Sequence, residues 1–349
     1  MPSLELSTAR FQPCMDSFLG AWAGVLNALE DPLPMEDLWG LSGLAFRTQI
    51  QRQLLPVGLL PRQWDETCAA VVMRTGYACT AGLRDHFYTQ DDLRQIQIAW
   101  MKEIEKALED GRPAISFGLH GPAFGIIKGF DADTENYLVS TFMDGRNDAP
   151  INALDVGSLR PPCIFVLIPT GPLALMPGTD TNDPNSGLSA TRHAAELGAL
   201  KEACTHHLGR EVDAHGEGLD IPRDLAAGPG AYNVWASAIE TGQIAQHWGL
   251  AYSAAYYAEA RSAAAAWLKK LAQDAHWADA ARRFESAAKH FSHEAESFVR
   301  LPKLFPLAQP EALQDSGRRT DASACLRMAR AEHIAALELL IEAVDERRE

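Results

Sequence analysis

The chain has 349 residues, of which 47% are hydrophobic and 22% are charged. These values are near the globular average, so they predict a packed core, exclude wholesale disorder, and at this length favour two domains. The formal net charge of −15 argues against a nucleic-acid partner, because phosphate contacts require a basic surface. No uninterrupted apolar run reaches the length of a membrane span and the N-terminus lacks signal-peptide features, so we expect no membrane partner and a cytoplasmic location.

Helix signals dominate the first 111 residues. Apolar residues recur at helical period from Phe18 to Leu29, and Pro13 suits the first turn of that helix. Cys14 would then lie in the first turn. A short helix is expected within residues 35–47, another ends near Gly76, and a long one is expected over residues 89–111.

Four short runs rich in β-branched and aromatic residues follow, separated by Gly, Asp and Asn turns. They cover residues 112–119, 124–131, 136–142 and 162–169, with a hairpin loop at 131–136. Helices followed by antiparallel strands predict an α+β domain over residues 1–172. The Pro- and Gly-rich stretch 173–187 is a predicted linker, and the alanine-rich residues 188–349 predict an all-helical bundle without strands.

Cys14 is the candidate nucleophile. A cysteine in the first turn of a helix lies at the positive end of the helix dipole, which favours the thiolate. A working thiol also needs a histidine that accepts its proton and returns it to the leaving group. The competing interpretation is a buried structural thiol, the common state of cysteine in globular proteins. None of the six cysteines forms a C-x-x-C pair, so no disulfide framework is expected.

Several stretches carry a family pattern. Cys14 opens its predicted helix, residues 33–47 read "LPMEDLWGLSGLAFR", and residues 110–140 contain a Gly-x-Pro strand followed by an aromatic, apolar, Gly-aromatic-Asp strand. Together they resemble the butirosin-biosynthesis protein H N-terminal family, a papain-like group related to the double-glycine bacteriocin-processing cysteine peptidases. Residues 230–239 and 256–268 also resemble the C-terminal part of such proteins.

The resemblance implies a papain-like fold, with Cys14 on a helix that faces a sheet carrying the histidine and then an acidic residue. Ala123, followed by Phe124, stands where the family has its histidine, and His120 is the nearest histidine. Asp144 is the nearest acidic residue after the third strand. Gln12 is a candidate oxyanion donor, although papain-like enzymes place that glutamine further upstream.

Two functions therefore stay open. The first is a thiol acyltransferase or amidohydrolase that forms a thioester on Cys14 and acts on a small acyl or peptide-like substrate; the resemblance suggests transfer from a carrier protein in specialised metabolism. The second is a papain-like ligand-binding protein that lacks the usual histidine, with Ala123 and Phe124 at its site. Retention of Cys14 favours the enzyme, and Ala123 favours the binding protein. No cofactor is expected in either case.

The helical half offers two further candidates. Tyr256, Glu259 and Arg261 are either packing residues or the lining of a groove for an acyl or aromatic ligand. His290 and His293 have a spacing that can bind a metal, but no acidic cluster at matching spacing completes a site. We therefore interpret these histidines and Glu294 as a solvated helix face, and expect no metal.

Overall fold

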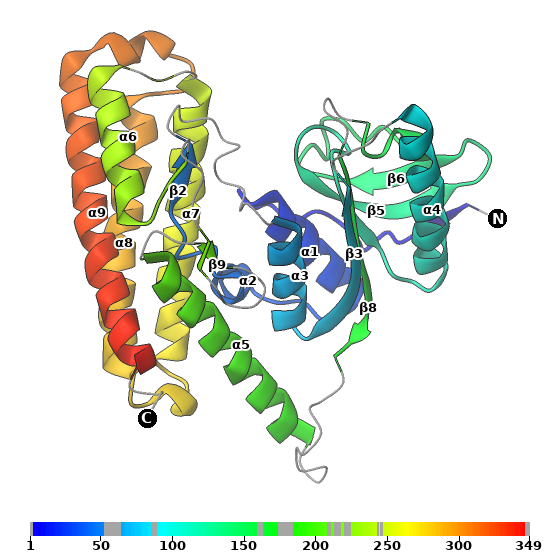
Figure 1. The fold of residues 1–349 in the computed structure, drawn as a ribbon, viewed down its shortest axis with the longest axis horizontal. Coiled ribbons are helices and arrows are strands. Elements are labelled where there is room, and N and C mark those ends of the chain that lie inside the picture. Colours follow the sequence, from blue (N-terminus) through cyan, green and yellow to red (C-terminus); the bar gives the residue numbers. More distant parts are fainter. Residues whose placement is uncertain are drawn as a thin grey trace. The chain divides into compact units, whose positions relative to one another are not determined.

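The computed structural model describes residues 3–51, 64–84, 89–158, 163–173, 184–207, 211–212, 218–219, 225–242, 244 and 247–345. The chain divides into two compact units (Figure 1). The first contains Met1–Leu38 and Cys68–Gly178, and the second contains Trp39–Thr67 and Thr179–Glu349.

The first unit is α+β. Its antiparallel sheet has the strand order β3-β8-β4-β5-β6-β7, and β1 pairs with β5. The strands are β1 (Leu4–Glu5), β3 (Tyr77–Arg84), β4 (Ala114–Phe117), β5 (Phe124–Asp131), β6 (Asn136–Ser140), β7 (Ile151–Asn152) and β8 (Ile164–Pro172). The helices are α1 (Ser17–Ala28), α3 (Trp64–Arg74), which belongs to this unit from Cys68 onward, α4 (Gln90–Glu109) and the short 3-10 helix η2 (Ala153–Asp155).

Helices α1 and α4 cover opposite faces of this sheet. Successive side chains of a strand point to opposite faces. The side chain of Ile126 on β5 contacts the α1 backbone at Gly24, whereas Ile127 joins the apolar core that α4 forms with the sheet. The start of β5 therefore lies on the face of the sheet that α1 covers. Cys14 was expected in the first turn of this helix.

The four predicted strand regions and the hairpin between β5 and β6 are confirmed. Strand β3, which no pattern in the sequence predicted, forms the edge of the sheet and pairs with β8 along its length. Strand β3 consists mostly of small residues, "YACTAGLR", and lacks the β-branched run that marks its neighbours.

The start of α1 differs from the prediction. Its N-cap is Asp16, whose Oδ1 accepts hydrogen bonds from the backbone N–H groups of Phe18 and Leu19 at 3.0 Å each. Cys14 thus lies two residues before the cap and not in the first helical turn. The physical reason is that aspartate accepts from the first backbone donors of a helix, which cysteine does poorly.

The second unit is mostly helical, as predicted. Its helices are α5 (Pro184–His207), α6 (Pro229–Thr241), α7 (His247–Leu271), α8 (Ala281–Leu304) and α9 (Ser316–Asp345), with the 3-10 helices η3 (Ala275–Trp277) and η4 (Pro310–Gln314). The expectation of no strand was wrong. Short strands β9 (Glu211–Val212) and β10 (Gly218–Leu219) pair with each other, and β11 (Leu225–Ala227) pairs with β2 (Gln49–Gln51).

The domain boundaries also differ from the prediction. Residues 1–172 were assigned to one domain, yet the chain leaves the first unit within α2 (Met35–Ser42), and Trp39–Thr67 belongs to the helical unit. The side chain of Arg261, which is fully buried, holds this segment through the carbonyl groups of Ala45 and Arg47. Such a contact joins residues more than 200 positions apart, so no local pattern announces it.

Residues 174–183 of the predicted linker, 173–187, lie outside the described residues, and its end was predicted too late, because α5 already begins at Pro184. Its richness in Pro, Gly, Asn and Asp still predicts that limited proteolysis cuts first between Pro172 and Gly187, because such a stretch has little to bury. Mass spectrometry of the first fragments measures this. Digestion of the helical half before this stretch would show that the linker is misplaced.

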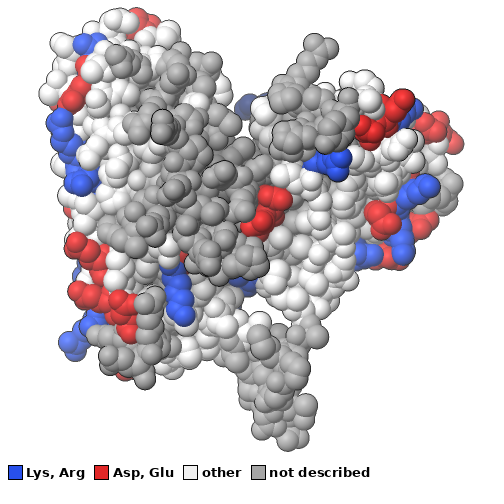
Figure 2. All heavy atoms as spheres, viewed as in Figure 1, with Lys and Arg blue, Asp and Glu red and all other residues white. Residues whose placement is uncertain are grey.

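None of the described helices is long and apolar enough to span a membrane. On the face drawn in Figure 2, the Lys and Arg side chains lie interspersed with the Asp and Glu side chains on both units. The basic residues described on that face therefore do not gather into one surface, which agrees with the net charge of −15.

Candidate functional site

The segment that carries Cys14 runs close against α1. A Cβ atom on Gly24 would lie 2.2 Å from the carbonyl oxygen of Arg10, and one on Gly20 would lie 2.6 Å from that of Gln12. Only glycine allows this approach. The N–H of Gln12 donates to the carbonyl of Gly20 at 3.0 Å, so the chain is held on the helix just before Cys14.

Two hydrogen bonds fix this segment to the sheet. The N–H of Phe11 donates to Ser140 Oγ at the end of β6 (2.8 Å), and Ser17 Oγ accepts from the N–H of Phe124 at the start of β5 (3.1 Å). Cys14 is three residues from each anchor, a path of at most about 10 Å. The half-buried Cys14 is thereby confined to the corner where β5 begins and β6 ends.

Phe124 fills the sheet side of this corner. Its ring packs edge-on against three phenylalanines, with ring centroids at 5.3 Å (Phe18), 5.1 Å (Phe117) and 5.5 Å (Phe165), and it is buried. Ala123 before it is partly exposed and places only a methyl group there. Phe124 is thus a core residue, and Ala123 supplies no group that transfers a proton.

Both ring nitrogens of His120 lie near other groups. Nε2 is 3.0 Å from the carbonyl oxygen of Ala149, so it carries the proton, and Nδ1 is 3.5 Å from Thr141 Oγ1. The glycines on either side of the turn, Gly118 and Gly121, have φ values of 85° and 133°. The loop therefore directs His120 toward the segment that follows β6.

Asp144 lies at the same corner, where its carboxylate accepts two hydrogen bonds. Its Oδ1 accepts from the N–H of Thr141 at 2.7 Å, and its Oδ2 accepts from the hydroxyl of Ser140. Because Ser140 Oγ also accepts from Phe11, the carboxylate supports the anchor of the Cys14 segment. The structure thus brings His120 and Asp144 to the same segment, where each contacts Thr141.

The side chain of Gln12 is bonded to the backbone of its own segment. Its Nε2 donates to the carbonyl of Arg10 at 2.9 Å. This bond uses one of the two N–H groups of the amide, so the oxyanion role expected for this side chain would fall to the other. Ser140, Thr141 and Ser17 are the residues that sequence reasoning missed, and the only signal for them was their place at the ends of predicted elements.

In the helical unit, the expected ligand groove is filled by protein. Arg261 has no exposed surface and donates to Glu294 Oε1 (2.6 Å) as well as to the segment 45–48. Glu259 accepts from Trp39 Nε1 at 3.2 Å, and the rings of Tyr256 and Trp39 meet edge-on at 5.3 Å. In the structure, Tyr256, Glu259 and Arg261 therefore contact residues 39–48 of the same chain.

Glu294 is not part of a solvated face, as the sequence had suggested. It is fully buried, where it accepts from Arg261, from the Tyr232 hydroxyl and from His333 Nδ1 (3.1 Å). Burial raises the pKa of Glu294, but the charges of Arg261 and His333 outweigh that effect, and the net pKa is lowered. Burial also disfavours the charge on Arg261, yet Glu294 keeps the pKa of that guanidinium above its ordinary value.

His290 and His293 lie next to Glu332 of α9. Their Nδ1 atoms lie 2.7 Å and 3.6 Å from Glu332 Oε2. Within the described part of the chain, no group of three or more His, Cys, Asp and Glu side chains has the arrangement of a metal site.

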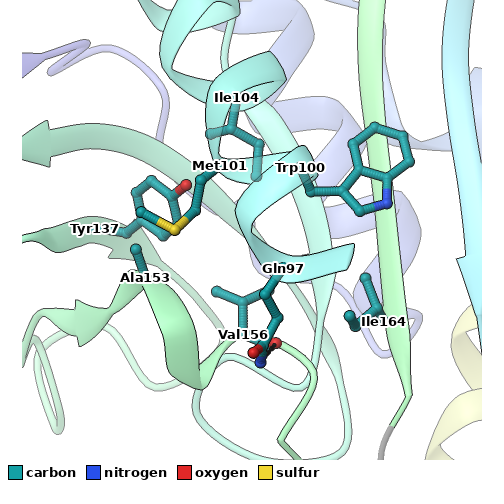
Figure 3. A pocket seen from close by; sticks show the side chains of 8 residues that line it. All are labelled: Gln97, Trp100, Met101, Ile104, Tyr137, Ala153, Val156 and Ile164. Atoms are coloured by element: carbon teal, nitrogen blue, oxygen red, sulfur yellow. Dashed lines mark hydrogen bonds between the residues drawn. The ribbon is translucent and has the colours of Figure 1, made fainter. Parts of the chain in front are cut away.

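A small cavity lies between α4 and the sheet of the first unit (Figure 3). Its volume is about 10 Å³, the space of roughly one water molecule. It is lined by Gln97, Trp100, Met101, Ile104, Tyr137, Ala153, Val156 and Ile164. The hydroxyl of Tyr137 is buried there without a hydrogen-bond partner among the described residues, and burial raises the pKa of this group. The cavity is too small for an acyl or peptide-like substrate.

The substitution Tyr137→Phe should leave the first unit as stable as the wild type or stabilise it by up to about 1 kcal/mol. An unpaired buried hydroxyl costs desolvation energy, and the phenyl ring keeps the packing. Urea unfolding measures the difference. A clear loss of stability would show that the hydroxyl binds a buried water.

Comparisons with known proteins add no family: no family model matches the chain, and no curated protein matches it.

Proposed function

We propose that the α+β unit is a papain-like ligand-binding domain that lacks a Cys-His dyad. The ligand is a small acyl or peptide-like molecule, as the resemblance to the butirosin-biosynthesis protein H N-terminal family suggests. The acidic net charge fits such a ligand, or a partner with a basic patch, better than an equally acidic carrier protein. A cytoplasmic location is part of the same proposal.

One observation carries this proposal. The corner that confines the Cys14 segment holds Ala123 and the buried Phe124 at the start of β5, and the ring nitrogens of His120 lie beside the Ala149 carbonyl and the Thr141 hydroxyl. A dyad requires a nitrogen acceptor within about 3–4 Å of the thiol. The acidic member of the site, Asp144, is likewise engaged by Ser140 and Thr141.

The rate of alkylation by iodoacetamide against pH tests the proposal, read by intact mass and peptide mapping. Without a dyad, Cys14 reacts as an ordinary thiol, and its rate rises only as the pH approaches about 8.5. Cys163, which is also half-buried, is the internal comparison. Fast labelling of Cys14 near pH 6, abolished in Cys14→Ser, would overturn the proposal.

The second candidate function is the thiol acyltransferase, with Cys14 as nucleophile and His120 as base. The two anchors at Phe11 and Ser17 favour it, because they hold Cys14 at the corner to which the His120 loop also leads. Incubation with an acyl thioester distinguishes the two functions. A covalent acyl adduct on Cys14 that is lost in His120→Asn supports the enzyme, and its absence supports the binding protein.

A further inference from the structure

A single buried arginine holds the backbone of the segment 45–48 in the helical unit. Arg261 Nη1 donates to the carbonyl of Ala45 at 2.5 Å, and Nη2 donates to the carbonyl of Arg47 at 3.0 Å and to the Thr48 hydroxyl. Glu294 fixes the other edge of the guanidinium. The contacts to the two carbonyls recognise main chain and not a particular side chain.

The following residues are also held by their backbone. The carbonyl of Thr48 accepts from the N–H of Gly228 (2.8 Å) and from His206 Nε2 (3.0 Å). The hydroxyl of Tyr257 accepts from the N–H of Gln49 at 2.8 Å and donates to the carbonyl of the same residue. Residues 49–51 then add a strand to β11, with Ile50 opposite Ala226.

Two aromatic side chains anchor the segment on either side of these contacts. Trp39 is fully buried between Tyr256 and Glu259, and Phe46, also fully buried, packs against Trp267 and Phe291 with centroids at 5.8 Å and 5.4 Å. A Cβ on Gly40 would lie 2.1 Å from the Trp267 ring. The site thus accepts aromatic residues seven positions apart and requires glycine after the first.

We propose that the helical unit is a peptide-binding module, and that residues 39–51 occupy its site as a tethered ligand. Strand addition, main-chain hydrogen bonds and side-chain anchors are elements by which proteins recognise peptides. Here residues 39–42 are the last turn of helix α2, and residues 49–51 form the added strand. The chemical class of ligand is a peptide with a Trp-Gly pair, a phenylalanine seven residues after the tryptophan, and an extended end that pairs with β11. This inference concerns a different site from the proposed function and does not rest on it.

The experiment uses the full chain with a recognition sequence for a site-specific protease inserted after Gly178. Cleavage separates residues 1–178 from residues 179–349, so the tethered segment and the helices no longer share a chain. Both halves are unfolded in urea and refolded together, with or without a tenfold excess of a labelled synthetic peptide of residues 39–51. Refolding in the presence of competitor removes any effect of slow exchange.

We expect the labelled peptide to elute with residues 179–349 in size-exclusion chromatography. The same peptide with Trp39→Ala and Phe46→Ala is the matched control, and its binding should fall at least 100-fold, because each anchor is fully buried. Equal binding of the two peptides, or no binding of either to refolded helices, would overturn the proposal.

A second measurement on the uncut chain covers the case in which the halves do not refold. Tyr257→Phe removes both hydrogen bonds to Gln49, so hydrogen exchange at the Gln49 amide should become about tenfold faster. Amides of α9, such as Leu337, should keep their rates. An unchanged rate at Gln49 would show that the backbone contacts do not hold the segment, and would contradict the proposal.

Discussion

Glu294→Ala should destabilise the helical unit by about 3–5 kcal/mol, which lowers its Tm by roughly 10 °C. The substitution leaves the guanidinium of Arg261 buried with no counter-charge, and it also removes the acceptor of Tyr232 and His333. A buried charge that loses its partner costs far more than a surface ion pair. Calorimetry or urea unfolding measures the loss.

Glu296→Ala is the matched control, because Glu296 is exposed on the same helix two residues away. Its effect should stay within about 0.5 kcal/mol. Pairing Glu294→Leu with Arg261→Met removes both charges, and should cost clearly less than the sum of the two single substitutions. Equal effects of Glu294→Ala and Glu296→Ala would mean that the buried pair does not support the helical unit.

The same carboxylate makes a pH prediction. The pKa of Glu294 is lowered in the folded chain from its ordinary value of 4.5. A group of this kind stabilises the folded state at pH values above 4.5, and that stabilisation is lost as the pH falls through the lowered pKa. Unfolding by acid should therefore be less steep in Glu294→Ala than in the wild type. An identical acid dependence in the two proteins would show that Glu294 does not titrate in this way.

Local signals explain which elements the sequence predicts well. Helix α4 has a capping box, in which Thr89 accepts from the Asp92 N–H and Asp92 accepts from the Thr89 N–H, and both residues are visible in the sequence. The strands β5 and β8 are runs of apolar residues bounded by turns. In each case the information lies within a few residues of the element.

The features that the sequence does not predict depend on contacts between residues that are far apart in the chain. The segment 39–51 joins the helical unit through Arg261, Tyr257 and Trp267, and the Cys14 segment is fixed by Ser140 and Phe124. No periodicity encodes such pairs, because each depends on tertiary packing. One wrong prediction, the start of α1, had a local cause. Asp16 is a stronger helix cap than Cys14, and the sequence alone shows this preference.

Ala123→His should restore a base at the corner that holds Cys14. The new imidazole would stand on the residue before Phe124, whose N–H bonds Ser17 three residues from the thiol. An ordinary thiol with a pKa near 8.5 is only a few per cent thiolate at pH 7, whereas a thiol paired with a histidine is largely ionised. Alkylation of Cys14 at pH 7 should therefore become about tenfold faster, as measured by intact mass.

The control for this gain is Ala123→Gln, which adds similar bulk without a titratable group and should leave the rate unchanged. Cys14→Ser in the Ala123→His background should remove the fast fraction, which assigns it to Cys14 and not to Cys163. The gain should disappear below about pH 5. There the imidazole already carries a second proton, so it cannot accept the thiol proton, and the thiol stays protonated. If Cys14 is labelled at the same rate in Ala123→His and Ala123→Gln, the side chain at position 123 does not face Cys14. The absence of a histidine at this position would then not explain an ordinary reactivity of the Cys14 thiol.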